Sequence, residues 1–315
     1  MAAVVASLTF LARECDPDGA LNPRTPQRKD LMVHRPVEML DGREAAASEA
    51  WLPQLDKRGF SLATQFNNQV PLAVLRDPSQ VMRSGYATEV EQMLLRALPQ
   101  VGFCFAFNFV LRKTDLLVHT LPADDKSTRG PVNDVHSDYT DDSFVIKAIN
   151  DRRDKLGLGG ARCMILNVWR PLLEPGKLLE SWPLCVCDAS SVASADIAER
   201  ESPENKSWIQ NAYHSPGQRW NWFPAMASDE AIVFKTFESD RVEGVSPFAL
   251  HCSFDQQQSQ DVEAQPQVRE SIEVRVACFV TQPDLGEAAF QVWSPQQYLA
   301  WSTFTHSRTY YLDPP

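Results

Sequence analysis

Short β-prone segments separated by turn residues fill the second half of this chain. From about residue 160 onward, apolar runs rich in Val, Ile, Phe, Trp and Cys alternate with clusters of Pro, Gly and Asp, a pattern typical of antiparallel sheets that pack into a barrel. The runs are 163–169, 183–187, 220–223, 231–237, 248–254 and 271–280. They predict a mainly β fold with flanking helices (α+β), in which the strands form a double-sheet barrel of the jelly-roll type.

Other segments predict what surrounds this core. An aromatic and nearly uninterrupted apolar run at 101–112 predicts a long buried strand. Three segments predict helices from apolar spacing or from a Ser-Pro start: 81–98, 141–155 and 293–301. Shorter strands are expected at 4–11 and 32–34. We predict an N-terminal extension, 1–60, that packs on a single barrel domain, 61–315, ending in the last of these helices.

Composition limits the partners of the chain. Its 315 residues are 43% hydrophobic, which is enough for a substantial buried core. The net charge of −11 argues against nucleic acid or a membrane surface as partner, because both require a basic face. No segment approaches the length of a membrane span, and residues 1–12 lack the basic start of a signal peptide. The oligomeric state stays open, with a homodimer as one option.

The cysteines indicate the compartment. There are seven of them, an odd number without a Cys-x-x-Cys pair, so neither a disulfide framework nor a zinc site is predicted. A reducing, cytoplasmic environment is the expected location.

His136 and Asp138 are the first candidates for chemistry. In an extended segment, residues two apart point to the same side, so this imidazole and carboxylate can occupy adjacent positions on one metal ion. A second histidine would complete a two-histidine, one-carboxylate triad, the metal-binding set of non-heme Fe(II) oxygenases. His251, inside the apolar run 248–254, is the candidate for it. The alternatives are a surface turn at His136 and a hydrogen-bonded core histidine at His251.

A basic stretch follows the last of these histidines. Arg269, Ser271, Glu273 and Arg275 share one face of an extended chain, whereas the apolar residues between them share the other. An arginine inside a barrel favours a carboxylate ligand, because a guanidinium and a carboxylate pair through two parallel hydrogen bonds. The alternative is an edge strand with solvated charges, which remains open for Glu273.

Seven blocks of the sequence resemble one family. The chain is similar to the fungal and bacterial Fe(II)/2-oxoglutarate-dependent oxygenases that include cephalosporin 7α-methoxylase and the fungal gibberellin desaturase. The blocks are 55–60, 135–139, 166–172, 183–191, 219–224, 229–235 and 268–275. They extend over most of the chain, and their combination is far more specific than any one block.

The resemblance implies a cofactor and a cosubstrate. It implies a double-stranded β-helix core, the jelly roll of cupin-like proteins. It also implies non-heme iron held by His136, Asp138 and His251, with 2-oxoglutarate and O2 at the remaining positions. Arg269 and Ser271 match the Arg-x-Ser pattern of such enzymes and are preferred for the distal carboxylate of 2-oxoglutarate, with Arg275 as competitor. One departure is that Leu250 precedes His251 where relatives have proline, the proline being displaced to Pro247.

Polar residues on neighbouring strands are candidates for the rest of the site. Asn167 and Trp169 alternate with Val168 and Arg170, so one pair should face the barrel interior and the other should face outward. Asn167 is expected near the cosubstrate. The candidates for substrate binding are Tyr139, Trp169, Arg170 and Lys235.

Two of these candidates predict the kind of substrate. If Arg170 or Lys235 faces the pocket, the substrate should be a small molecule that bears a carboxylate, such as an amino-acid-derived metabolite. The alternative is a structural ion pair, with Glu230 or Glu238 as partner of Lys235.

Three functions remain open from the sequence. The first is an oxidoreductase of secondary-metabolite biosynthesis, a dioxygenase that hydroxylates, desaturates or cyclises its substrate at an unactivated C–H bond. The second is a catalytically silent relative that binds or scaffolds a partner. The third is a cupin-like metalloenzyme that needs no keto acid.

Overall fold

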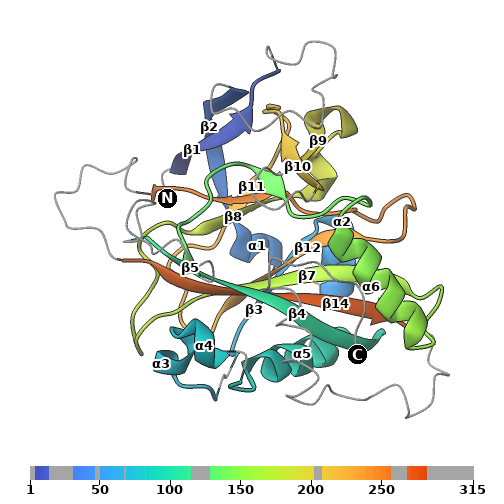
Figure 1. Cartoon of the computed structure of the whole chain (residues 1–315). Helices are drawn as coiled ribbons and strands as arrows, with labels where there is room; N and C mark the ends of the chain where they lie inside the picture. Colours follow the sequence, from blue (N-terminus) through green and yellow to red (C-terminus); the bar gives the residue numbers. More distant parts are fainter. Residues whose placement is uncertain are drawn as a thin grey trace.

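Two curved β-sheets face each other across the protein (Figure 1). The computed structural model describes residues 4–13, 31–46, 50–66, 69–81, 83–114, 128–201, 208–256 and 268–281. Eight strands form one sheet, in the order β1 (Val4–Leu11), β2 (Met32–Asp41), β11 (Trp220–Trp222), β8 (Leu184–Cys187), β13 (His251–Ser253), β6 (His136–Ser137), β10 (Trp208–Ala212) and β9 (Ile197–Glu201). Six form the other, in the order β3 (Phe60–Ala63), β12 (Ala231–Glu238), β7 (Arg162–Pro171), β14 (Glu270–Val280), β4 (Val101–Lys113) and β5 (Thr128–Arg129).

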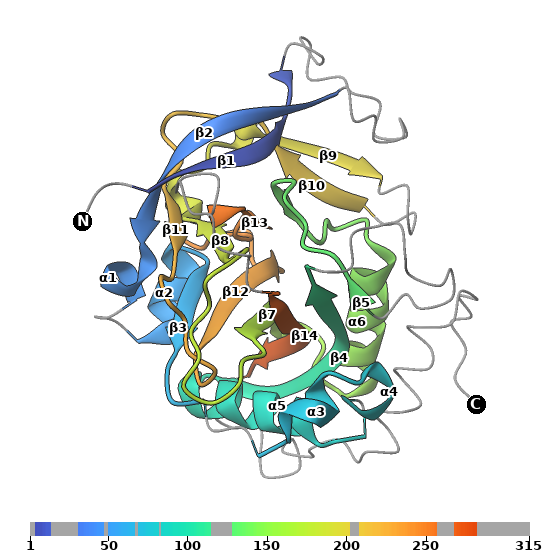
Figure 2. The same ribbon diagram turned by 90° about the vertical axis from the view of Figure 1, so that its left-hand side faces the viewer.

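The helices lie outside this pair of sheets. They are α1 (Gly42–Ala46), α2 (Trp51–Lys57), α3 (Leu72–Leu75), α4 (Pro78–Val81), α5 (Tyr86–Ala97) and α6 (Phe144–Lys155). Figure 2 shows α3, α4 and α5 on the side of the six-stranded sheet that faces away from the other sheet. The buried face of α5 packs against the aromatic strand β4 in the largest apolar cluster of the described residues. This arrangement of two facing sheets with outer helices confirms the predicted jelly-roll class.

Strand pairing brings separate parts of the chain to one place between the sheets. In the eight-stranded sheet, His251 of β13 pairs directly with His136 of β6. In the other sheet, β14 runs between β7 and β4, so that Arg275 lies opposite Asn167 and Ser271 lies opposite Arg112. Because strand neighbours on one face stand about 5 Å apart, these pairings fix which side chains can meet.

Most elements that the sequence predicts are present, with shifted ends. The helix expected over 81–98 begins only at Tyr86, because Gly85 has a φ of 82° and interrupts the helical path. The strand expected at 32–34 continues to Asp41, and β9 and β10 were not predicted. The helix expected at 293–301 lies outside the described residues.

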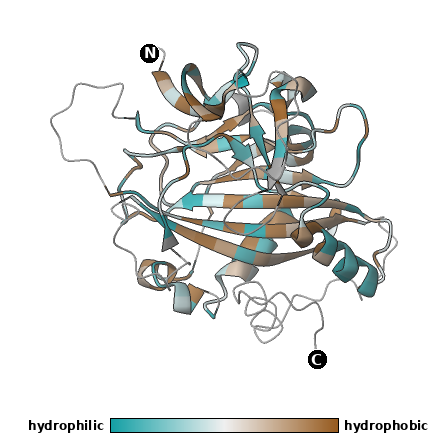
Figure 3. Cartoon of the chain, turned by 45° about the horizontal axis from the view of Figure 1, so that its top comes forward, coloured by the Kyte–Doolittle hydropathy of each residue, from teal (hydrophilic) through white to brown (hydrophobic). Residues whose placement is uncertain are grey.

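Hydropathy follows this architecture. Figure 3 shows strands that are largely hydrophobic, with single hydrophilic positions set among the apolar ones. Some polar side chains are buried: Asn167 of β7, Glu273 of β14 and Arg269, directly before β14, are each less than 5% exposed. Buried polar groups of this kind usually have a specific partner or a function. Among the helices of the described ranges, none is long and apolar enough to cross a membrane.

Candidate active site

His136, Asp138 and His251 meet between the two sheets. The imidazole rings of His136 and His251 have centroids 4.4 Å apart, and His136 Nε2 lies 3.7 Å from Asp138 Oδ1. One nitrogen or carboxylate oxygen from each residue lies within 4.8 Å of the other two. Three donors at such separations can all bind one metal ion placed among them, since metal–ligand distances are about 2.0–2.2 Å.

Hydrogen bonds orient both imidazoles for metal binding. His136 Nδ1 lies 2.8 Å from the carbonyl oxygen of Asp134, and His251 Nδ1 lies 3.3 Å from that of Ala249. A carbonyl oxygen only accepts, so each Nδ1 carries the hydrogen and each Nε2 keeps its lone pair. Burial, followed by the neighbouring His251, lowers the pKa of His136 to about 4, and burial also lowers the pKa of His251. Both rings are therefore neutral at pH 7, as metal ligands must be.

Two residues of the six-stranded sheet hold Asp138. Asn167 Nδ2 donates to Asp138 Oδ2 over 2.8 Å, and Arg275 Nη2 donates to Oδ1 over 3.2 Å. Burial alone would raise the pKa of Asp138, but the positive charge of Arg275 and smaller effects from the two histidines bring it well below its usual range. The carboxylate is thus ionised. Two neutral imidazoles and a carboxylate fit ferrous iron, which suits mixed nitrogen and oxygen ligands.

Arg269 and Arg275 differ in their neighbours. Arg275 is engaged by two carboxylates, since its Nε also donates to Glu273 Oε1 over 3.1 Å. Arg269 is fully buried, and only its Nη2 has a partner, Ser253 Oγ at 3.0 Å. Its Nε and Nη1 have no acceptor within the described ranges, and the same is true of the buried Ser271 hydroxyl. Arg269 therefore offers an open fork for a carboxylate, whereas Arg275 serves to position Asp138.

Arg112 is a pocket residue that sequence reasoning missed. It lies opposite Ser271 in the sheet and lines the same pocket as the three candidate metal ligands. Its Nη1 donates to the carbonyl oxygen of Gly130 over 2.8 Å. Burial, followed by the charge of Arg112, lowers the pKa of Arg269 to about 9. The sequence contained a signal for it, since Arg112 is the basic residue at the end of the mostly apolar run 101–112.

The alternation along β7 decides which predicted residues face the pocket. Trp169 lines it, with the guanidinium of Arg269 5.2 Å from the centre of its ring, and Asn167 lies on the same face. Asn167 donates its amide hydrogens to Asp138 and Glu273, so it positions the candidate ligand, and its expected role beside the cosubstrate stays a prediction. Arg170 points to the opposite face of the sheet, where it contacts the rings of Phe66 and Tyr86.

Three further predictions have clear outcomes. Lys235 does not line the pocket, because its Nζ is buried against Glu238 Oε2 at 2.8 Å and Asp56 Oδ1 at 3.2 Å. Of the two partners considered for it, Glu238 is the right one, since Glu230 pairs with Arg43. The edge-strand alternative for Glu273 is wrong, because β14 is an inner strand and Glu273 is buried. Tyr139 lies under Arg275, 5.8 Å from guanidinium carbon to ring centre, and does not line the pocket.

A comparison with protein families decides where this chain belongs. The family model described as "Oxidoreductase/YMDC permease-like domain" matches residues 11–279. The chain belongs to this family. Residues 11–279 contain the six-stranded sheet up to Phe279, the eight-stranded sheet apart from β1, and all three candidate metal ligands, so the matched domain includes the whole site.

Curated relatives of this family member come from fungi. Aspirochlorine biosynthesis protein N of Aspergillus oryzae is 34% identical over 140 residues, which are 43% of this chain and 55% of that protein. Hydroxylase/desaturase efuI of Hormonema carpetanum is 27% identical over 246 residues, which are 71% of this chain and 78% of that protein. The Fe(II)/2-oxoglutarate-dependent dioxygenase nvfI of Aspergillus novofumigatus is 30% identical over 156 residues, which are 47% of this chain and 52% of that protein. The match thus spans about half the length of two of these relatives.

A solved structure shares the fold. The iron and alpha-ketoglutarate-dependent endoperoxidase NvfI superimposes with a TM-score of 0.66 at 20% identity, covering 89% of this chain and 99% of that one. The family resemblance that the sequence blocks indicated is confirmed, since the relatives bear the names of Fe(II)/2-oxoglutarate-dependent oxygenases and hydroxylase/desaturases.

Proposed function

We propose that this protein is a non-heme Fe(II)- and 2-oxoglutarate-dependent dioxygenase that oxidises an unactivated C–H bond of a small molecule in secondary metabolism. One observation carries the proposal: a two-histidine, one-carboxylate donor set shares its pocket with a fully buried arginine, Arg269, whose Nε and Nη1 have no acceptor among the described residues. The donor set supports iron, and the open fork supports a dicarboxylate cosubstrate. The names of the fungal relatives support the same activity.

We assign roles to the residues as follows. His136, Asp138 and His251 hold the iron, and Arg269 with Ser271 binds the distal carboxylate of 2-oxoglutarate. Arg112, across the sheet from Ser271, adds a second positive charge beside that carboxylate. When bound together, iron, 2-oxoglutarate and O2 supply the oxidising chemistry, in which the cosubstrate is converted to succinate and CO2.

The remaining side chains organise the pocket. Arg275 and Asn167 hold the carboxylate of Asp138 in one orientation, because Arg275 donates to Oδ1 and Asn167 donates to Oδ2. The indole of Trp169 covers the guanidinium of Arg269 and keeps water from it, so that a carboxylate arriving there forms its hydrogen bonds in a dry environment. These residues bind and orient, and none of them needs to change its protonation state.

The substrate class is less constrained than the cosubstrate. A carboxylate-bearing, amino-acid-derived substrate was expected because of Arg170 and Lys235, and neither side chain lines the pocket. We therefore propose a small-molecule substrate without an assigned acid group. Hydroxylation, desaturation and ring closure all remain compatible with the site. A cytoplasmic location and the oligomeric state, a homodimer included, stay predictions.

Anaerobic titration tests this function. Purified protein receives Fe(II) and then 2-oxoglutarate under nitrogen, and a weak visible charge-transfer band is expected once the keto acid chelates the iron. Admitting O2 should then produce succinate. If iron binds without any such band, the keto-acid-independent metalloenzyme is favoured. If a panel of secondary metabolites gives neither band nor succinate, the silent relative is favoured.

A further inference from the structure

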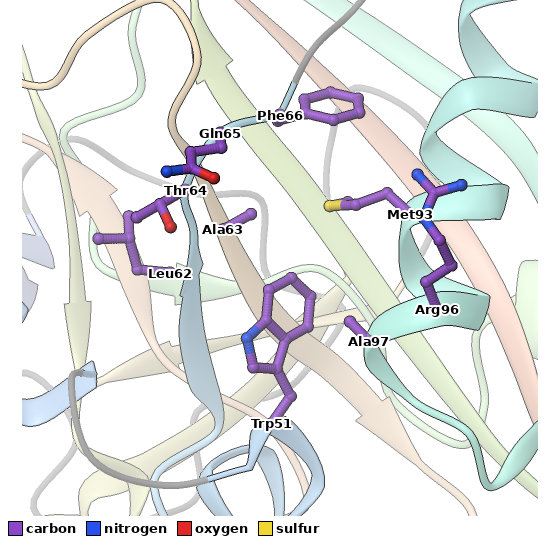
Figure 4. A pocket seen from close by; sticks show the side chains of 9 residues that line it. All are labelled: Trp51, Leu62, Ala63, Thr64, Gln65, Phe66, Met93, Arg96 and Ala97. Atoms are coloured by element: carbon purple, nitrogen blue, oxygen red, sulfur yellow. The ribbon is translucent and has the colours of Figure 1, made fainter.

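A second pocket lies outside the pair of sheets, between the edge strand β3 and helix α5. It encloses about 490 Å³. Figure 4 shows Trp51, Leu62, Phe66 and Met93 around it, with Arg96 toward its rim. The lining thus combines these apolar and aromatic side chains with the polar Thr64 and Gln65 and the cationic Arg96. No residue that lines the iron pocket takes part in this one.

A buried cation without a complete set of partners lies behind one wall of this pocket. Arg170 is 5% exposed, and its guanidinium carbon is 5.4 Å from the centre of the Phe66 ring and 5.9 Å from that of Tyr86. Its Nη2 donates to the carbonyl oxygen of Ser228. Its Nε and Nη1 find no acceptor among the residues the structure describes. The hydroxyl of the fully buried Tyr86 completes no hydrogen bond there either, but it lies near this guanidinium, which lowers the pKa of the phenol against the larger opposing effect of burial.

These three unused groups are complementary to a carboxylate. Burying a charge or a hydrogen-bonding group without a partner costs several kcal/mol, so such groups are normally satisfied by protein, water or a ligand. The nearest acid along α5 is Glu89, whose two oxygens accept from the backbone N–H of Gln69, each over 3.2 Å. Neither oxygen accepts from Nε or Nη1 of Arg170. Two N–H groups of a guanidinium and one phenol suit an external carboxylate.

Phe66 separates the apolar pocket from these polar groups. Its ring lines the pocket and also contacts the guanidinium of Arg170. The preceding residue, Gln65, has a φ of 58°, a left-handed conformation that side chains other than glycine rarely adopt. Backbone strain of this kind is frequent at ligand-binding sites, and here it lies directly before the residue that separates the pocket from Arg170.

We propose that this region is a binding site for a carboxylic acid with an apolar body, separate from the iron pocket. The carboxylate binds Arg170 and Tyr86 when the Phe66 ring turns aside, and the apolar body fills the space between Leu62, Met93 and Trp51. The site is distinct because Arg170 and Trp169 are adjacent on β7 and face opposite sides of the sheet.

Calorimetric titration of octanoate into the full chain tests the proposal. The protein is loaded with Mn(II) and saturating 2-oxoglutarate, so that the iron pocket is already filled. Octanoate should bind under these conditions, and octan-1-ol, which has the same chain without the charge, should bind at least about tenfold more weakly. Octanoate that binds only in the absence of 2-oxoglutarate occupies the iron pocket instead, and that result would overturn the proposal.

Three variants locate the carboxylate. Arg170→Met should weaken octanoate binding by about tenfold or more, and Tyr86→Phe by about threefold, because each removes hydrogen-bond donors. Arg96→Met is the matched control at the rim and should change binding less than about twofold. If Arg96→Met abolishes binding while Tyr86→Phe has no effect, the anion is held at the surface and the proposal is wrong. Should Arg170→Met fail to fold, Tyr86→Phe and the octanol comparison decide.

Discussion

Single side chains in the iron pocket are distinguished by what already pairs with them. Arg269 lies directly before strand β14 and Arg275 lies within it. Arg275 donates to two carboxylates, whereas the guanidinium of Arg269 lies over the Trp169 ring and, among the described residues, donates only to the hydroxyl of Ser253. Their hydrogen-bond partners, and not the residue type, therefore distinguish their roles. Arg269 has donors available for a ligand, whereas Arg275 already binds Asp138.

Exchange of each arginine for lysine should separate these roles. Arg269→Lys keeps the charge and loses the planar fork, so we expect the KM for 2-oxoglutarate to rise by about tenfold or more, roughly 1.4 kcal/mol. Arg275→Lys should instead weaken metal binding, because Asp138 loses its oriented partner. Succinate formation and Mn(II) titration measure the two effects. The reverse pattern would assign the cosubstrate to Arg275.

Loss of a proposed ligand should have a different signature. His251→Ala removes one of three metal donors, so we expect no detectable turnover and much weaker Mn(II) binding, with an unchanged far-ultraviolet circular dichroism spectrum. His214→Ala, at a half-buried histidine outside the pocket, is the matched control. Full activity in His251→Ala would remove the central claim about the metal site.

Among the elements, β12 contains a charge that looked functional in the sequence and is structural in the fold. The fully buried Lys235 and Glu238 of β12 form a network of ion pairs with the half-buried Arg162 of β7 and Asp56 of α2. Truncating one member of a buried ion pair leaves the charge of the other buried without a partner, which usually lowers the free energy of unfolding by about 3–5 kcal/mol.

Lys235→Met should consequently lower the free energy of unfolding by about 3–5 kcal/mol and leave the KM for substrate unchanged. Chemical denaturation and steady-state kinetics give the two values. Lys147→Met, on the exposed side of α6, is the control and should change stability by less than about 0.5 kcal/mol. A raised KM with unchanged stability would restore the substrate-binding role for Lys235.

Helix α5 contributes a pH dependence to stability. Glu91 is buried and accepts the backbone N–H of Ala106 over 2.7 Å, and its pKa is raised to about 7, chiefly by burial. Between its usual pKa of 4.5 and about 7, the folded protein holds this proton and the unfolded chain does not. Stability from this group is therefore present below about pH 4.5 and is lost as the pH rises to about 7.

Replacement of Glu91 by glutamine should remove that dependence. We expect the wild type to lose roughly 3 kcal/mol of unfolding free energy from this group over that pH interval, and Glu91→Gln to lose correspondingly less. Urea denaturation at several pH values measures the difference. Glu38→Gln, on the exposed side of β2, should leave the wild-type slope unchanged, and an equal slope in Glu91→Gln would contradict the assignment.

At the scale of the whole molecule, the site joins the two sheets. His136 and His251 belong to the eight-stranded sheet, whereas Asn167 and Arg275, which hold Asp138, belong to the six-stranded sheet. A ligand that binds only the folded protein stabilises it in proportion to its occupancy. Metal and cosubstrate should thus stabilise the contact between the sheets.

Thermal unfolding should report this coupling. With Mn(II) and 2-oxoglutarate each at about a hundred times its Kd, stabilisation of roughly 2.7 kcal/mol per ligand is expected, and Tm should rise accordingly. A chelator should reverse the metal-dependent part, and His251→Ala should not show it. A Tm that stays unchanged with both Mn(II) and 2-oxoglutarate would argue against the proposed site.

The sequence by itself determined the class of the fold and the candidate ligands. Alternating apolar segments between turn residues require two packed sheets, and the spacing of His136 and Asp138 puts both on one side of an extended segment, because these patterns depend only on local geometry. Only the tertiary structure decided which group each charged side chain contacts, and therefore which role we assign to it. Only strand pairing set His251 against His136, left Arg269 open and Arg275 committed, and placed Arg170 behind the sheet. The physical reason is that contacts between strands distant in sequence arise from register and burial, which no local pattern encodes.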